Sequence, residues 1–299
     1  MEAPLRTAVL GPGGVGGLLA ALLASDGHPV VCLAGEDTTA ALREHGLRLD
    51  SARFGPRVQT VDAVGVLDRP VDVCLVTVKA TQLDDAVRRV PAQVLGKALL
   101  VPFLNGIEHV ALLRQRYPEA VVAPATIRVE STRPAPGRVR HDSPFAMVEL
   151  TAAPGVDRLA QALAHAGLDV RTRDDENAVL WDKLGFLAPL ALLTTVAGQP
   201  AGVVREQRRE DLLALIDEAA AVARAEGAPG DARAVLAAFD ALPPTMRSSM
   251  QRDAEARRPT EIDALGGAVL RAAARHGIAV PVTARIVAEL QSRGSAGTG

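Results

Sequence analysis

A cluster of glycines near the N-terminus has the spacing of a phosphate-binding loop. Residues 11–17 read Gly-Pro-Gly-Gly-Val-Gly-Gly and contain the pattern G-x-G-x-x-G. The pattern follows the short apolar run Thr7–Leu10 and opens the apolar segment Leu18–Ala24. A strand before the glycines and a helix after them form the context in which this pattern binds dinucleotides. The alternative is a flexible loop of small residues.

Each glycine of the pattern has its own reason to lack a side chain. Gly11 would permit the tight turn, Gly13 would let the backbone approach a pyrophosphate, and Gly16 would let the helix pack closely on the strand. The start of the helix supplies N–H groups and the positive end of the helix dipole. We therefore expect a cofactor to contact Gly11, Pro12, Gly13, Gly14, Val15 and Gly16.

The residues after the second expected strand bear on the choice between NAD and NADP. An acidic residue about 20 positions beyond the glycines favours the ribose 2′-hydroxyl of NAD, whereas an arginine favours the 2′-phosphate of NADP. Residues 33–37 read Leu-Ala-Gly-Glu-Asp, so Glu36 is a candidate cofactor-binding residue that would repel a phosphate. Arg43 lies further along the next helix and could reach back. As an alternative, Glu36 and Asp37 only cap that helix.

Lysine is rare in this chain, so the positions of the lysines are informative. The lysines are Lys79, Lys97 and Lys183. Lys79 follows an apolar strand, at the end where open α/β sheets bind ligands, and Asn105 follows the next strand. Lys183 lies early in the first helix of the second half, whereas Lys97 precedes a strand and is expected in solvent. Solvated lysines and an Asn-Gly turn would also explain these residues one by one.

The elements that must position these residues alternate between strand and helix in the first half of the chain. The expected strands are 7–10, 30–33, 71–78 and 98–104, and the expected helices are 18–24, 38–44, 83–90 and 107–116. This alternation predicts a parallel sheet with right-handed crossovers. After residue 117, short strands are expected at 121–130, 137–141, 146–150 and 168–171, with a helix at 156–166.

The second half of the chain is expected to be entirely helical. The predicted helices are 176–196, 206–226, 231–242, 245–255, 260–276 and 281–293, separated by glycines and prolines. We therefore predict an α/β Rossmann-type dinucleotide-binding domain over 1–173 and an all-α substrate and catalytic domain over 174–293. A Gly/Ser-rich tail over 294–299 is expected to be disordered.

The composition argues against several classes of protein. Of the 299 residues, 48% are hydrophobic and 23% are charged, which suits two folded domains and not a disordered chain. The formal net charge of −2 and the aromatic content of 2% argue against nucleic-acid binding. The histidines show no metal-ligand spacing, so no metal is expected. We expect a small-molecule substrate as the partner.

The N-terminal residues and the cysteines bear on the compartment. Residues 1–4 lack a basic region followed by an apolar stretch, so no signal peptide is expected. The longest apolar runs fall short of the ~18 residues that suggest a membrane span, so no membrane partner is expected. Cys32 and Cys74 lie in expected strands, which predicts two buried, reduced thiols. The protein is therefore expected to be cytoplasmic.

Several motifs, taken in their order along the chain, resemble those of one enzyme family. After the glycine cluster they are Val76–Lys79, Asn105-Gly106, Pro136–His141, Trp181–Leu184, Ser248–Met250 with Asp253, Thr260–Asp263 with Gly266, and His276–Pro281. Their order is similar to that in the ketopantoate reductase (2-dehydropantoate 2-reductase) family, from residue 7 to about residue 290. The part from Ser248 to Asp263 is the most family-specific.

The resemblance implies an NADPH-dependent reductase with a Rossmann-type N-terminal domain and a helical C-terminal domain. It implies that Lys183 donates the proton to the substrate carbonyl, and that Lys79 and Asn105 line the nicotinamide and substrate cleft. It also implies that Glu261 contacts the cofactor and that Ser249 holds the substrate carboxylate. A protonated lysine suits hydride addition to a ketone, because it can stabilise the developing negative charge and deliver a proton.

The sequence also departs from the family pattern. Leu187 and Ala191 stand where the family carries asparagines one and two turns after the lysine, and Ala201 replaces a third asparagine. Leu187 and Ala191 are thus candidate substrate residues that would make the pocket more apolar. Gly35 stands where the family has its phosphate-binding arginine. NADP(H) is therefore expected from the resemblance, while NAD(H) remains open.

Three functions remain open at this point. The first is a ketopantoate-reductase-like NAD(P)H reductase of a 2-oxo acid or related carbonyl, with Lys183 and Lys79 as candidate catalytic residues. The second is a reductase of a less polar carbonyl or imine with the same fold, which the missing asparagines keep open. The third is a non-catalytic dinucleotide sensor, against which the retention of Asn105 and Glu261 argues. A homodimer is the candidate assembly.

Overall fold

The structure is a computed structural model that describes residues 3–296. In it the chain forms two compact units. The first unit comprises the residues up to Leu104 together with His109–Val179. The second comprises Asn105–Glu108 and the residues from Leu180 onward. The short segment Asn105–Glu108 therefore belongs to the helical second unit, although both of its flanks belong to the first.

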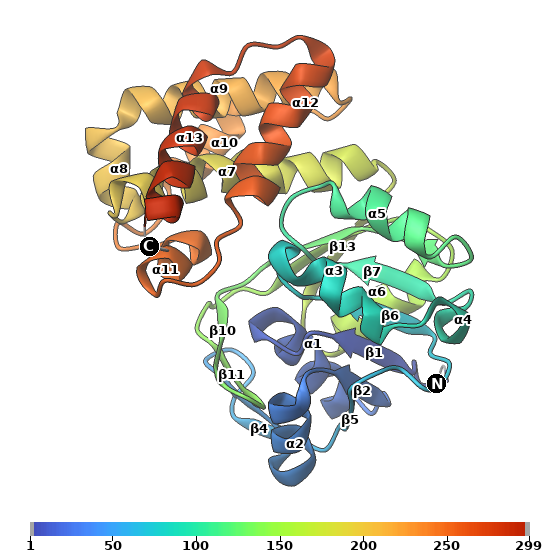
Figure 1. Cartoon of the computed structure of the whole chain (residues 1–299). Helices are drawn as coiled ribbons and strands as arrows, with labels where there is room; N and C mark the ends of the chain where they lie inside the picture. Colours follow the sequence, from blue (N-terminus) through green and yellow to red (C-terminus); the bar gives the residue numbers. More distant parts are fainter. Residues whose placement is uncertain (1–2, 297–299) are drawn as a thin grey trace. The chain divides into compact units, whose positions relative to one another are not determined.

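The first unit is built around a six-stranded sheet with the order β5-β2-β1-β6-β7-β8 (Figure 1). The strands are β1 (Thr7–Leu10), β2 (Val30–Leu33), β5 (Asp62–Val64), β6 (Val73–Val76), β7 (Leu99–Pro102) and β8 (Val121–Val122). Every neighbouring pair is parallel, which confirms the predicted parallel sheet. β1, β6 and β7 are buried along their whole length, as expected for strands covered on both faces.

Helical segments connect these strands. They are α1 (Gly14–Ser25), α2 (Glu36–His45), η1 (Ala80–Gln82), α3 (Leu83–Ala86), η2 (Val87–Arg89), α4 (Ala92–Leu95) and α5 (His109–Arg116). The helix expected over 83–90 is instead split into the short α3 and a 3₁₀ turn, η2. Val90 precedes Pro91 and is extended, with φ −120° and ψ 86°. A residue before proline avoids the helical region, so the helix ends there.

Two smaller sheets complete the first unit. A four-stranded sheet has the order β10-β11-β3-β4 and a three-stranded sheet has the order β13-β12-β9. Their strands are β3 (Leu47–Ser51), β4 (Arg57–Gln59), β9 (Ala125–Arg128), β10 (Ser131–Ala135), β11 (Arg138–His141), β12 (Met147–Thr151) and β13 (Asp169–Arg173), and α6 (Val156–His165) packs on β12 and β13. The strand expected over 121–130 is split at Pro124, which has no N–H group to pair.

The second unit is entirely helical around one apolar core. Its elements are α7 (Glu176–Ala197, whose first residues lie in the first unit), α8 (Ala201–Gln207), α9 (Arg209–Ala225), α10 (Ala232–Asp240), α11 (Ser249–Glu255), the π-helical turn η3 (Asp263–Gly267), α12 (Ala268–His276) and α13 (Pro281–Ala296). α13 continues through Ala296, so it includes the first part of the expected tail. Residues 297–299 of that tail lie outside the described residues.

One helix of the described chain is long and apolar enough to cross a membrane by length and composition alone. This helix is α7, and 72% of its most apolar window is buried inside the protein. Such burial is the pattern of a core helix.

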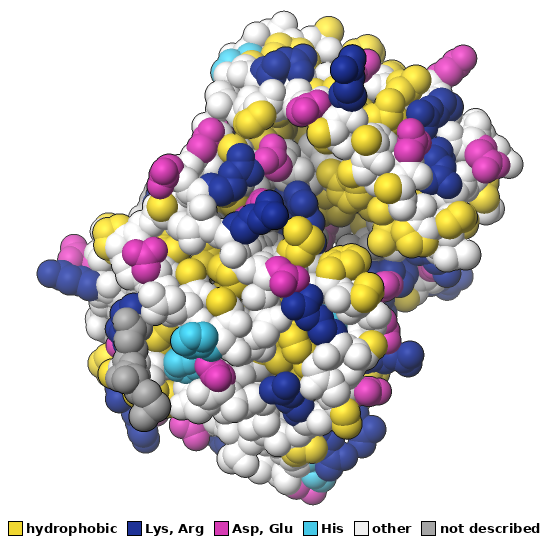
Figure 2. All heavy atoms as spheres, turned by 180° about the vertical axis from the view of Figure 1, so that it is seen from behind, with side chains coloured by type: hydrophobic (Ala, Val, Ile, Leu, Met, Phe, Trp, Pro, Cys, Tyr) yellow, Lys and Arg dark blue, Asp and Glu magenta, His cyan; other side chains and the backbone are white. Residues whose placement is uncertain are grey.

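On the face drawn in Figure 2, acidic and basic side chains are interspersed and do not separate by sign.

Both cysteines are buried and not disulfide-bonded, as predicted. Cys32 lies in β2 and Cys74 in β6. Burial raises the pKa of each thiol to about 12, because the thiolate would lose its hydration.

Candidate functional site

Two of the fingerprint glycines are required by the packing of the first unit. Gly11 has a φ of +85°, a left-handed conformation that glycine adopts without strain. A Cβ on Gly16 would clash with Thr77 Oγ1 and with the carbonyl oxygen of Gly11. The Thr77 hydroxyl donates to the carbonyls of Leu10 and Gly11 at 3.0 and 2.9 Å, and thereby holds the loop against β6.

Gly13 is different, because the described residues 3–296 leave the space beside it almost empty. A Cβ on Gly13 would meet only the carbonyl oxygen of Gly11, at 3.9 Å. Gly13 precedes α1, and no side chain caps the first turn of that helix. Open space next to an uncapped helix N-terminus fits the pyrophosphate of a dinucleotide. Internal packing therefore does not account for the absence of a side chain at position 13.

The rest of the loop is supported from the four-stranded sheet. A Cβ on Gly14 would clash with the carbonyl of Ser131, and the Ser131 hydroxyl donates to Gly14 O at 2.8 Å. Pro12 is buried and Val15 is half-buried against the core of the unit. β10 therefore helps to fix the loop, a role that the sequence did not indicate because β10 lies more than 100 residues away.

The residues that bear on the choice of cofactor lie at the two ends of α2. Gly35 is the N-cap of α2 with an extended backbone, and no side chain caps this helix. Glu36 is exposed in the first turn of the helix. Arg43 lies in the last turn, where its Nε donates to the carbonyl of Ala63 at 2.9 Å.

Lys79 belongs to the first unit. It lies beyond the carboxyl end of β6, is half-buried and forms the N-cap of η1. The carbonyl of Lys79 accepts a hydrogen bond from Gln82 N at 2.9 Å. Because β1 and β6 are neighbours in register, Lys79 and the glycine loop both follow the carboxyl edge of one parallel sheet, which is the ligand edge of such folds.

The second unit contains a buried carboxylate with a fixed amide partner. Glu261 is 6% exposed, just before η3, and its Oε2 accepts a hydrogen bond from Asn105 Nδ2 at 2.9 Å. Asn105 is half-buried. The structure thus brings together two residues that the sequence had proposed for one site from positions 156 residues apart.

The segment Asn105–Glu108 is tied to the second unit at its other end as well. Arg271 forms a two-point ion pair with Glu108, at 2.7 and 2.6 Å, and a second ion pair with Asp263. These hydrogen bonds raise the pKa of Arg271, Glu108 contributing most. A Cβ on Gly106, whose φ is +84°, would clash with the carbonyl of Ala264. The close approach and the ion pair together fix the position of Asn105.

Lys183 lies on α7 and is half-buried. Trp181, two residues before it, is 3% exposed and packs in the core of the unit. Leu187 is half-buried and Ala191 is buried, one and two turns further along α7. At this spacing they share a helix face with Lys183, so the next two turns of that face carry apolar side chains at these positions.

Two adjacent serines at the start of α11 have different environments. Ser249, the residue that the resemblance assigned to the substrate, is exposed. Ser248 is 4% exposed, caps α11 by accepting from Gln251 N at 3.0 Å and hydrogen-bonds Thr194 Oγ1 of α7 at 2.8 Å. Gln251 is buried, and its Oε1 has no hydrogen-bond partner among the described residues.

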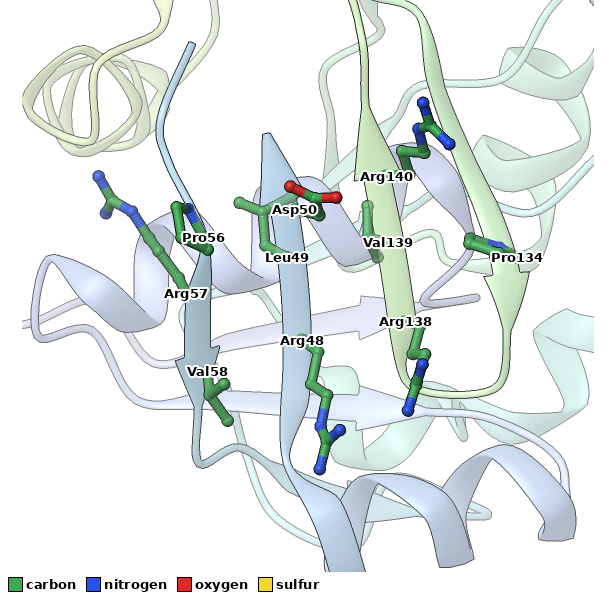
Figure 3. Close-up of a pocket in the computed structure, with 10 residues that line it drawn as sticks. All are labelled: Arg48, Leu49, Asp50, Pro56, Arg57, Val58, Pro134, Arg138, Val139 and Arg140. Carbon is green, nitrogen blue, oxygen red and sulfur yellow. The ribbon is translucent and has the colours of Figure 1, made fainter. Parts of the chain in front are cut away.

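A hollow of about 480 Å³ lies on the four-stranded sheet (Figure 3). Its charged lining consists of four arginines and one aspartate: Arg48, Arg57, Arg138, Arg140 and Asp50. Arg48 and Arg138 are paired in register on adjacent strands, and Arg140 forms an ion pair with Asp142. The glycine loop and the candidate residues of the second unit do not line this hollow.

Among residues 3–296 the structure holds no cluster of three potential metal ligands.

Comparison with known proteins assigns the chain to a family. A family model described as ketopantoate reductase PanE/ApbA matches residues 7–153, and the model of its C-terminal part matches residues 175–293. A 2-dehydropantoate 2-reductase of Caulobacter vibrioides is 31% identical over 292 residues, covering 95% of this chain and 98% of that protein.

Solved structures agree with this match. A PanE/ApbA family ketopantoate reductase from Ralstonia eutropha JMP134 is 29% identical, with a TM-score of 0.88 over 97% of this chain and 98% of that one. D-Mandelate dehydrogenase with NADH and anilino(oxo)acetate has the same fold, with a TM-score of 0.89 at 21% identity over 97% and 98% of the two chains. The chain therefore belongs to the ketopantoate reductase family of oxidoreductases, as its motifs had predicted.

Proposed function

We propose that this protein is an NAD(P)H-dependent reductase of a 2-oxo acid, with Lys183 as the proton donor and ketopantoate as the first substrate to test. The observation that carries the proposal is the buried Glu261 carboxylate held by Asn105 in the unit that also contains Lys183. The family membership and the open space beside Gly13 support it. The reduced nicotinamide, when bound, supplies the hydride.

The roles of the residues follow from the charge that develops on the substrate. As the carbonyl carbon accepts a hydride, its oxygen becomes negative and requires a proton. A lysine ammonium can stabilise this oxygen and then protonate it, which is the role assigned to Lys183. Asn105 and Glu261 form one hydrogen-bonded unit that positions polar groups for the substrate or for a ribose hydroxyl. Lys79 follows the ligand edge of the sheet and is the alternative proton donor.

The first test compares Lys183→Ala with Lys79→Ala in steady-state kinetics on ketopantoate and related 2-oxo acids. Loss of a positioned acid lowers kcat by about 10²–10⁴-fold, so we expect that loss for Lys183→Ala with little change in cofactor affinity. Lys97→Ala is the control, because Lys97 is exposed. Retained kcat in Lys183→Ala with loss in Lys79→Ala would reverse the two roles.

A second candidate substrate class is a less polar 2-oxo acid or related carbonyl. Leu187 and Ala191 follow Lys183 along α7 and offer no hydrogen-bonding side chains. A pocket without such groups discriminates poorly in favour of hydroxylated substrates. Kinetics on 2-oxo acids of graded polarity distinguish the two classes, because Leu187→Asn should improve kcat/KM only for hydroxylated ones.

Cytoplasmic location and a homodimer stay predictions, and sedimentation velocity would check the assembly state.

A further inference from the structure

A guanidinium from another segment lies beside Gly35, at the position where the sequence provides no cation. Nη2 of Arg89, in η2, is 3.9 Å from the position that a Cβ on Gly35 would take. Nη1 of Arg89 donates to the carbonyls of Ala34 and Gly65, at 3.0 and 2.8 Å. These carbonyls belong to the loops after β2 and β5, which are neighbouring strands. All these residues lie in the first unit.

The bonding of Arg89 leaves part of the guanidinium available. A guanidinium has five N–H donors, and Nη1 uses its donors on the two carbonyls. In the part of the chain that the structure describes, no side-chain or backbone acceptor is bonded to Nη2 or Nε of Arg89. The group is half-buried and held at two points, so little freedom is left to lose when an anion binds. Its remaining donors therefore form a preorganised anion-binding group.

The location of this group coincides with the place where Rossmann folds distinguish their cofactors. The loop after the second strand contacts the adenosine ribose, and a cation there selects the 2′-phosphate of NADP. Residue 35 itself lacks a side chain, and residues 33–37 contain no cation. The absence of a side chain on Gly35 keeps Nη2 of Arg89 accessible at this point, since a bulky residue would occupy the same space.

Two other arginines lie near α2, and both are less suited to this role. Arg43 lies at the opposite end of the helix and its Nε is bonded to Ala63 O. Arg133, on β10, is exposed, and its Nη1 donates to the Thr38 hydroxyl at 3.2 Å. Arg89 is the half-buried cation that is fixed to the β2 loop itself.

We propose that Arg89 is the specificity-determining residue of the cofactor site: its Nη2 and Nε donate to the 2′-phosphate of NADPH, in place of an arginine at position 35. The inference rests on the proposed function, because it requires a dinucleotide along the glycine loop. It predicts a preference for NADPH over NADH despite the glycine at position 35. Glu36, exposed in the first turn of α2, opposes this preference, so Glu36→Gln should increase it.

The test measures binding by calorimetry, which requires no turnover. Two ligand pairs differ only in the 2′-phosphate: NADPH with NADH, and adenosine 2′,5′-bisphosphate with 5′-AMP. Charge-assisted hydrogen bonds to a phosphate correspond to about a tenfold to hundredfold change in affinity. Arg89→Ala should weaken binding of the phosphorylated member of each pair by that factor and change the other member by less than about threefold. Arg88→Ala is the matched control, because Arg88 is exposed and pairs with Asp85.

The ratio within each pair separates recognition from support of the loop. Arg89 also holds the loops after β2 and β5, so a purely structural role would weaken both members of a pair equally and would overturn the inference. Arg89→Lys should keep part of the NADPH preference, whereas Arg89→Gln should lose it. If Arg89→Ala fails to fold by circular dichroism, Arg89→Gln carries the test, because its amide can still bond a carbonyl.

The inference and the proposed reaction can fail independently. A wild-type protein that selects NADPH through Arg89 but reduces no 2-oxo acid contradicts the reaction and leaves the role of Arg89 intact. A wild-type protein that reduces 2-oxo acids while binding NADH and NADPH equally contradicts the role of Arg89. Absence of binding by either nucleotide contradicts both.

Discussion

At the scale of single residues, Gly13 and Gly16 differ in what a new side chain would meet. The Cβ of Gly13→Val enters open space, so we expect the fold to persist and dinucleotide affinity to be lost. Gly16→Val would clash with Thr77 and with backbone, so we expect its free energy of unfolding to fall by several kcal/mol. Urea unfolding and calorimetric titration with NADPH measure the two effects. Unchanged cofactor affinity in Gly13→Val would remove the loop from the site.

The two thiols provide a second prediction at this scale. Burial raises the pKa of Cys32 and Cys74 to about 12, so almost no thiolate exists near pH 8, and the native protein should react with a disulfide reagent only as fast as it unfolds. The raised pKa also means that alkali lowers the free energy of unfolding. The contribution of the two protonated thiols to this free energy is complete below pH 9 and declines as the pH rises from 9 toward 12. Reaction of both thiols within seconds under native conditions would contradict this prediction.

The residue scale also shows why only part of the site could be predicted. Gly11, Gly13 and Gly16 form a short local pattern with a recognisable spacing, so the sequence alone could propose them as candidate site residues. Thr77 lies against the glycine loop and Arg89 lies beside Gly35 through tertiary contacts that no local pattern encodes. These positions are visible only in the tertiary structure.

At the scale of elements, the start of α11 depends on one hydroxyl. Ser248 caps α11 and bonds Thr194, which also donates to Leu190 O at 2.7 Å. Ser248→Ala should therefore lower the free energy of unfolding by about 1–2 kcal/mol, since a cap contributes about 1 kcal/mol and a buried hydrogen bond a similar amount. Ser249→Ala, at the exposed neighbour, should change it by less than about 0.5 kcal/mol. Urea unfolding of both variants measures the two changes in free energy. Changes of equal size would argue against Ser248 as the cap of α11.

Long apolar runs predicted elements well, and short polar ones did not. β1, β6 and β7 are buried on both faces and read as continuous apolar segments. β3 alternates buried and exposed residues over Leu47–Ser51 and follows the helix-ending Gly46, so its five residues gave too weak a signal. The helix expected over 245–255 begins only at Ser249. The sequence shows that a helix can start after Pro243 and Pro244, but it does not show that Ser248 is the residue that caps it.

At the scale of the whole molecule, the second unit is not one continuous stretch of sequence. A fragment of residues 175–293 would lack Asn105, Glu108 and the partly buried Ile107, which packs against the core of the unit. In such a fragment the buried Glu261 would lose its amide partner, at a cost of about 1–3 kcal/mol.

A difference between the two backgrounds follows from this arrangement. Glu261→Gln should destabilise the full chain, where Asn105 donates to the carboxylate, more than the fragment, where Asn105 is missing. The effect is measured by thermal unfolding of the wild-type and Glu261→Gln forms of both the full chain and the fragment. Lys97→Ala in the full chain is the control, and it should leave the unfolding temperature unchanged. Destabilisation of similar size in both backgrounds would show that the segment 105–108 does not support Glu261.

The same arrangement imposes a waiting time during synthesis. Asn105 is made 156 residues before Glu261, and a ribosome that adds about 5–20 residues per second needs about 8–30 s to cover that distance. During this interval β7 and α5 on either side of the segment can fold, while residues 105–108 still lack the partners that fix them. The first unit must therefore form around a short stretch of chain that stays unsatisfied until almost the whole protein has emerged.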